Sequence, residues 1–210
     1  MSATRPHPIH IVGGIDPGLS SGGVVLLQRD PERVLAAISL VEPAGSARAA
    51  LAQARAYLGA RGGWGDVEFT AAMIRAKNWM TLFRSRLDAV CAEVGPVDIW
   101  AIESFVDQRS RAREEKARLL KNRWMTPLVI GMLADELEAR GMSLENDRIV
   151  YQNAGIVIRQ MAEEIGRLKD RRRSAALDVV IPGDRLVTND HLRKAFAHAL
   201  ALHMRLPSIL

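Results

Sequence analysis

The sequence predicts an α/β fold in which a mixed sheet, made of an antiparallel three-stranded meander plus parallel strands, is flanked by helices. Three apolar runs, 9–16, 23–28 and 34–41, are separated by short stretches rich in Gly, Pro, Asp and Ser, which is typical of strands joined by tight turns. Further along, short apolar runs at 97–103 and 148–151 alternate with long segments of helical spacing. Alternating strands and helices are the pattern of a sheet covered by helices.

Composition places the chain among ordinary globular proteins. It has 210 residues, 48% of them hydrophobic and 25% charged, with 29 Lys and Arg against 24 Asp and Glu. We expect a single domain over 1–210, with residues 1–8 as a flexible arm. Cys91 is the only cysteine, so no disulfide forms within the chain. No apolar run approaches the roughly 20 residues that span a bilayer, and we expect a cytoplasmic protein with no membrane partner.

The first apolar run ends on an acidic residue. Asp16 is followed by Pro17, which cannot donate to a sheet, and by Gly18 and further small residues. One interpretation is an ordinary hairpin in which Asp16 caps its own turn. The other is a carboxylate at a strand end, facing a loop of small residues that a phosphate can approach. The first run taken alone leaves both interpretations open.

A second acidic residue ends the run 97–103. This run is nearly continuous in apolar residues, as expected for a central strand buried on both faces, and its last residue is Glu103. A buried carboxylate without a partner is costly, and a metal ion or another cation offsets that cost. Ligands of open α/β sheets bind at strand ends, so Asp16 and Glu103 are candidate site residues.

The helical segments carry one apolar stripe and one basic run. Helical spacing covers 46–61 and about 69–94, and we expect Trp79 and Phe83 of the second segment to lie in the core rather than on a ligand. Between 109 and 123, basic residues outnumber acidic ones seven to two. Such a run is either a solvated helix face or a phosphate-binding flank, and the charge pattern alone favours neither.

Four short motifs, taken in order, resemble the RuvC-type Holliday-junction resolvases of the RNase H-like superfamily, as a divergent branch that includes phage-borne forms. Gly14-Ile15-Asp16-Pro17-Gly18 resembles the first acidic motif of that family and Ala101-Ile102-Glu103 the second. Val150–Ala154 with Ile158–Gln160 resembles its later strand and DNA-contacting helix. His191–Ala195 resembles the last motif, except that Lys194 stands where the family has its final Asp.

The resemblance implies an RNase H-like sheet and a metal-dependent endonuclease that hydrolyses phosphodiesters in four-way or other branched DNA, as a homodimer and without a small-molecule cofactor. It implies Mg²⁺ or Mn²⁺ as the cofactor, since hard oxygen ligands suit both ions. Asp16 and Glu103 are the expected ligands, with Asp190 and His191 of the last helix completing the set. Lys194 is then expected to pair with Asp190 or to hold the scissile phosphate. For His191 and His198, the ordinary alternative is a surface histidine.

The expected DNA contacts follow the second acid and the later strand. Phe105 or Val106 matches the position where the family places an apolar residue beside the junction centre, and Phe105 either stacks on an unpaired base or packs in the core. The remaining expected DNA-binding residues are polar or basic: Arg109, Arg111, Lys116, Lys121, Arg123 and Gln160.

Two other classes of protein fit parts of the pattern. A non-catalytic protein that binds branched DNA is suggested by Lys194, which replaces a carboxylate of the family motif. An actin-like ATPase also begins with a Gly-Ile-Asp phosphate loop between two strands, but it needs a second such loop and a longer chain.

Overall fold

The computed structural model describes residues 9–18, 20–30, 32–104, 113–161 and 190–206. The predicted arm 1–8 lies outside these residues, as do Phe105, Arg109 and Arg111. For 113–124 the structure describes the backbone as helical but not the side chains, which include Lys116, Lys121 and Arg123.

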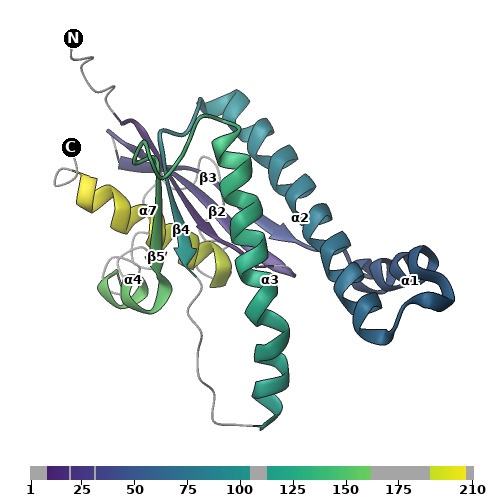
Figure 1. Ribbon diagram of the computed structural model, residues 1–210. Coiled ribbons are helices and arrows are strands. Elements are labelled where there is room, and N and C mark those ends of the chain that lie inside the picture. The colour runs from purple at the N-terminus through teal and green to yellow at the C-terminus, as the bar shows by residue number, and fades with distance from the viewer. Residues whose placement is uncertain (1–8, 19, 31, 105–112, 162–189, 207–210) are drawn as a thin grey trace.

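A five-stranded mixed sheet forms the centre of the molecule (Figure 1). Its strands are β1 (Ile11–Asp16), β2 (Ser21–Arg29), β3 (Glu32–Val41), β4 (Ile99–Ser104) and β5 (Ile149–Asn153), in the order β3-β2-β1-β4-β5. The β1–β2 and β2–β3 pairs are antiparallel, whereas β1–β4 and β4–β5 are parallel. The predicted α/β class, with a meander joined to parallel strands, is confirmed.

Helices cover both faces of this sheet. The helices in the described part of the chain are α1 (Ser46–Leu58), the short 3-10 helix η1 (Gly59–Arg61), α2 (Trp64–Val94), α3 (Arg113–Glu138), α4 (Ala154–Gln160) and α7 (Asp190–Arg205), of which α1 and η1 lie away from the sheet. α2 begins earlier than the predicted residue 69, because Asp66 Oδ2 accepts the backbone N–H of Gly63 at 3.0 Å and so caps the helix within the glycine-rich stretch. Among the described residues, no helix is long and apolar enough to cross a membrane.

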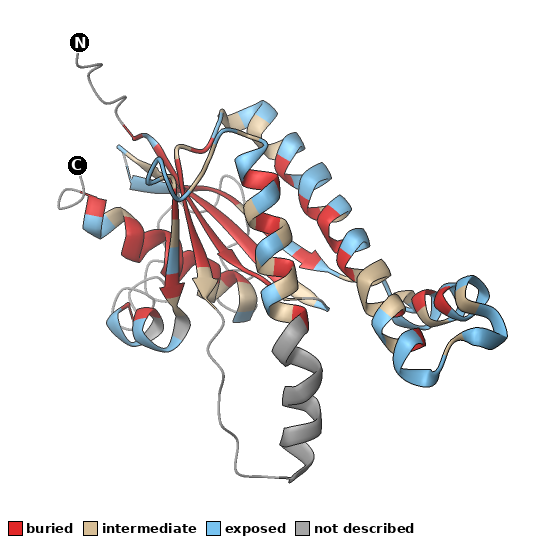
Figure 2. Cartoon of the chain, viewed as in Figure 1, coloured by how far each residue is buried: buried red, intermediate tan, exposed pale blue. Residues whose placement is uncertain are grey.

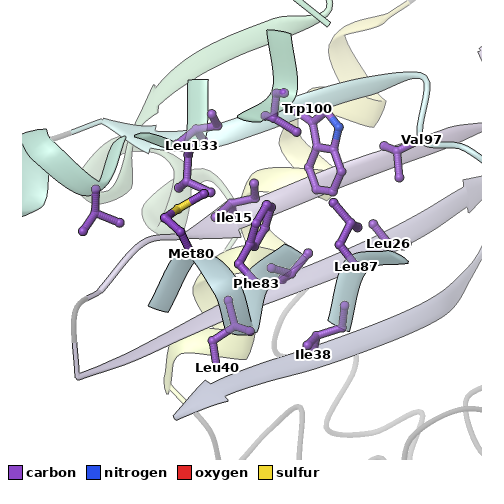
Figure 3. Packing of buried hydrophobic residues seen from close by; sticks show 14 of the residues in the cluster. Ile15, Leu26, Ile38, Leu40, Met80, Phe83, Leu87, Val97, Trp100 and Leu133 are labelled. Carbon is purple, nitrogen blue, oxygen red and sulfur yellow. The ribbon is translucent and has the colours of Figure 1, made fainter. Parts of the chain in front are cut away.

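Two apolar layers hold the helices to the sheet (Figure 2). On one face α2 and α3 pack on the strands, where Phe83 and Met80 of α2 and Leu133 of α3 meet Ile15 and Trp100 (Figure 3). Trp79 and Phe83 are buried and stack on one another, which confirms the expectation that both are core residues. On the other face α7 packs on β1, β2 and β4, and α4 packs on α7 and β5.

Glycines let α7 lie directly on the strands. A Cβ on Gly14 of β1 would overlap the carbonyl oxygen of Ala195 and lie 2.6 Å from the backbone nitrogen of Ala199. A Cβ on Gly23 of β2 would lie 2.5 Å from the backbone oxygen of His191. Because neither position has room for a side chain, the α7 backbone is held against β1 and β2.

A helical hairpin extends away from the sheet beyond β3 (Figure 1). It is formed by α1 and the first part of α2, and the two helices enclose a small separate cluster of buried side chains: Ala50, Ala54, Val67 and Ala71. Tyr57 and Trp64 are exposed on it, and the Arg55 guanidinium lies 5.2 Å from the centre of the Trp64 ring.

The glycine contact predicts that Gly14→Ala lowers the free energy of unfolding by about 1–3 kcal/mol or more, because the added methyl must displace helix backbone rather than a flexible side chain. Urea denaturation measures the change. Gly131→Ala in α3 is the matched control, since no atom lies within 4 Å of its added Cβ, and in a helix interior Ala is favoured over Gly by about 1 kcal/mol. Equal urea midpoints for the two variants would contradict the close contact.

Candidate active site

The two strand-end acids lie side by side on the face that α7 covers. Ile15 of β1 pairs with Ile102 of the neighbouring parallel strand β4, so the next residues, Asp16 and Glu103, are level with each other. Asp16 is 4% exposed and Glu103 is partly buried. The carboxyl groups are close enough for each to change the pKa of the other. The prediction that each acid lies at the end of a strand is confirmed, since Asp16 is the last residue of β1 and Glu103 the last but one of β4.

The N-terminal turn of α7 supplies a histidine to Asp16. His191 Nδ1 lies 2.7 Å from Asp16 Oδ2, and His191 Nε2 lies 2.6 Å from Ser21 Oγ at the start of β2. With Asp16 ionised, Nδ1–H donates to the carboxylate and Nε2 accepts the hydroxyl proton. The carboxylate thereby fixes the orientation and tautomer of the ring, and both ring nitrogens are engaged.

Two turns further along α7, a second histidine faces Glu103. His198 is 0% exposed, and its Nδ1 lies 2.9 Å from Gln152 Oε1 of β5. Its Nε2 is 3.7 Å from Glu103 Oε2, which is too long for a direct hydrogen bond. Neither of these two buried atoms has a hydrogen-bond partner in the described part of the chain. An ion, a water or a substrate group placed here would satisfy both.

Lys194 lies on α7 between the two histidines. It follows His191 by three residues and precedes His198 by four, which puts the three side chains on one face of the helix. Its Nζ is 3.5 Å from Asp190 Oδ2, and its side chain is 28% exposed. Burial alone would lower the pKa of Lys194, but the charges of Asp16, Glu103 and Asp190 raise it above its usual value. The ammonium group therefore stays charged beside the acids.

The two carboxyl groups have different electrostatic surroundings. Burial raises the pKa of Asp16 to about 6, although the hydrogen bond with His191 acts in the opposite direction. Burial also acts to raise the pKa of Glu103, but His198, Asp16 and Lys194 together lower it below its usual value. The hydrogen bond to Asp16 raises the pKa of His191. Near pH 6, Glu103 is therefore ionised, whereas Asp16 is about half protonated.

The structure brings together four of the five predicted catalytic residues: Asp16, Glu103, His191 and Lys194. Asp190 is directed differently, because its carboxylate binds Arg193 and Lys194 and is mostly exposed. Gln160 Oε1 accepts from Arg205 at the opposite end of α7, so this predicted DNA contact lies away from the acids. For His198, the interpretation as a surface histidine was wrong.

Sequence reasoning did not find Ser21 and Gln152. Ser21 is one of two adjacent serines in a turn, and only the position of His191 distinguishes it. Gln152 pairs with Glu103 across β4 and β5, so the sheet register would have indicated it. His198 lies seven residues after His191, and this two-turn spacing was the available signal that both face the same strands.

The predicted metal ligands do not all come together among the described side chains. Among them no group of three or more His, Cys, Asp and Glu residues is placed to hold a metal ion, so the predicted ligand set of Asp16, Glu103, Asp190 and His191 is not assembled. The Asp16–Glu103 pair remains, and a buried unpartnered oxygen of Glu103 lies within it. Mg²⁺ and Mn²⁺ accept hard oxygen ligands, and Mg²⁺ is commonly held by one or two carboxylates with water or phosphate completing the shell.

No model of a known protein family matches this chain. A search of curated proteins likewise finds no similar sequence. The geometry of Asp16, Glu103 and α7 is therefore the guide to function.

The pKa shifts predict how stability depends on pH. The pKa of Asp16 is raised from 3.8 to about 6 and that of His191 is raised from 6.5, so the folded protein binds more protons than the unfolded chain. The free energy of unfolding should therefore fall as the pH rises from about 5 through about 6, and the raised pKa of His191 continues the fall above 6.5. Asp16→Asn should flatten this slope, because it removes both shifts.

Urea titrations at pH 5, 6 and 7 measure this change in the free energy of unfolding. Asp30→Asn is the control, because Asp30 is exposed in a turn. Glu103, with its lowered pKa, contributes in the opposite direction only near and below its ordinary value of 4.5, outside this window. Equal slopes for wild type and Asp16→Asn would show that Asp16 titrates normally.

Proposed function

We propose that this protein is a divalent-metal-dependent endonuclease that cuts branched DNA, four-way junctions above all, within an RNase H-like sheet. The observation that carries the proposal is the level pair of buried acids, Asp16 and Glu103, on adjacent strand ends beneath a helix that adds His191 and Lys194. The order of elements and the motifs around both acids agree with the RuvC-type resemblance. Homodimerisation belongs to the same proposal, because a four-way junction has two-fold character and two matched sites would cut it symmetrically.

Each side chain has a definable part in phosphodiester hydrolysis. Asp16 and Glu103 would hold the metal ion, which supplies stabilisation of the charge that develops at the phosphate. His191 positions Asp16 through a 2.7 Å hydrogen bond and is itself held by Ser21. The Lys194 ammonium offers a hydrogen-bond donor and a positive charge to a phosphate oxygen. These groups orient and stabilise the phosphate where it would otherwise be repelled by two carboxylates.

The position of α3 supports DNA as the substrate. β4 ends at Ser104 beside the acids, and α3 begins at Arg113 and returns along the sheet (Figure 1). Met125 is buried in the core, and the twelve helical residues before it, 113–124, form a stretch about 18 Å long at 1.5 Å per residue. This stretch includes most of the basic run. It lies at the same end of the sheet as Asp16 and Glu103, where it would contact the phosphates flanking the cut.

A second candidate, a protein that binds branched DNA without cutting it, is favoured by one observation. Lys194 replaces an expected carboxylate, and the described residues do not assemble a set of three ligands. The two candidates differ in one measurable property, cleavage in the presence of Mg²⁺ or Mn²⁺.

A nicking assay tests the proposal. Wild type should nick a four-way junction in Mg²⁺ or Mn²⁺, should act weakly on linear duplex of the same sequence, and should not nick in EDTA. Asp16→Asn and Glu103→Gln should each lose at least about 10²-fold in cleavage, as expected for a positioned catalytic group, yet bind the junction as well as wild type or better. Asp30→Asn is the control for a change of charge alone. Tight binding by wild type with no cleavage would instead support the second candidate.

The basic run gives a separate prediction for binding. Changing Arg111, Lys116 and Lys121 together to Gln should weaken binding to junction and duplex alike, and each lost phosphate contact should reduce the slope of log affinity against log salt by about 0.9. The matched control changes Arg33, Lys77 and Arg86, which are exposed, to Gln and removes the same charge. If both triple variants change the slope equally, the run 109–123 has no special role.

A further inference from the structure

We infer that the Lys194 ammonium takes the place of a second divalent ion, so that this centre binds one ion and completes its positive charge with a side chain. The inference rests on the proposed function and specifies the cation content of its site. It concerns the one position where the last motif departs from the family that the sequence resembles.

Lys194 lies on the helix face that covers the two acids. On the face of α7 that covers the strand ends, His191 contacts Asp16 and His198 faces Glu103, and Lys194 lies between them along the helix. The His198 ring is fully buried, and its unpartnered Nε2 is directed at the unpartnered Oε2 of Glu103. A group that is not part of the described chain would satisfy both atoms, and Lys194 lies on the same helix face.

The described chain offers no ligands for a second ion. Asp190 was the candidate to replace the missing carboxylate, but its oxygens bind Arg193 and Lys194. His191 has both ring nitrogens engaged, one by Asp16 and one by Ser21. A second divalent ion would have to break these contacts and lie close to an ammonium group that stays charged.

Charge balance also favours a single divalent ion in the centre. Two ionised carboxylates and one ammonium group leave a single negative charge, and one divalent ion converts it to a single positive charge. A phosphodiester then neutralises the centre. A second divalent ion would leave two positive charges in excess, in a partly buried site where unbalanced charge is costly.

Pairing with Asp190 does not by itself account for Lys194. That pair is an i, i+4 contact at 3.5 Å to a carboxylate that is 54% exposed, and exposed pairs of this kind contribute little. Lys194 is more buried than Asp190, and the charges of Asp16 and Glu103 act together with Asp190 to offset that burial. Lys194 therefore responds to the acids of the sheet as well as to its neighbour on the helix.

The test counts Mn²⁺ bound to the full-length protein without DNA, by the loss of the free Mn²⁺ signal in electron paramagnetic resonance and by calorimetry. Wild type and Lys194→Arg should each bind one ion. Lys194→Asp should bind two, since it removes the cation and adds a carboxylate. Arg205→Asp is the matched control, because it makes the same change of charge at the far end of α7 and should still bind one.

Lys194→Gln keeps the inference testable if Lys194→Asp does not fold. It should bind Mn²⁺ at least several-fold more tightly than wild type, because the repelling charge is gone, while junction cleavage falls. Two comparable ions in wild type, or unchanged Mn²⁺ affinity in Lys194→Gln, would overturn the inference and leave the proposed nuclease intact. Wild type that binds no Mn²⁺ and cuts no junction would overturn both.

Discussion

The contact between α7 and the glycines of β1 and β2 is the constraint on which the centre depends. Gly14 and Gly23 leave no side chain between helix backbone and strands, so the α7 residues that face the sheet reach the strand-end groups directly. His191 reaches Asp16 and His198 approaches Glu103 because the helix lies this close. A helix held at the separation that ordinary side chains impose would leave the acids beneath a layer of apolar atoms, without their imidazole and ammonium neighbours.

The same closeness makes the centre costly for the fold. Asp16 is buried beside a second acid, and its raised pKa expresses the free energy that ionisation costs there. His191 and Lys194 offset part of that cost, and a bound cation would offset more. The fold is then less stable while no cation is bound. Such a loss of stability is common at functional centres that contain buried charges.

Local sequence patterns predict the fold class and the strand-end positions of the two acids, but they do not predict how the side chains of the centre are arranged. Apolar runs ending on Asp16 and Glu103 predict strand ends from neighbouring residues alone, and adjacent parallel strands then bring the ends together. The burial of His198 depends on where α7 lies on the sheet, which spacing within one helix does not determine. The orientation of Asp190 likewise depends on whether its carboxylate pairs with basic residues of its own helix or turns toward the strand ends. Arg193, three residues later, favours pairing within the helix.

The helical hairpin has a consequence for how the molecule opens. Its two helices meet through the small buried side chains of Ala50, Ala54, Val67 and Ala71, with Leu51, Leu58 and Ile74 only partly buried around them, so this contact buries little apolar area. The far part of the same α2 packs Phe83 and Leu87 against the sheet. We therefore expect two local stabilities within one continuous helix, with backbone amides near Val67 exchanging with solvent through openings that leave those near Phe83 protected. On this expectation the hairpin separates and reforms while the acids beneath α7 keep their places.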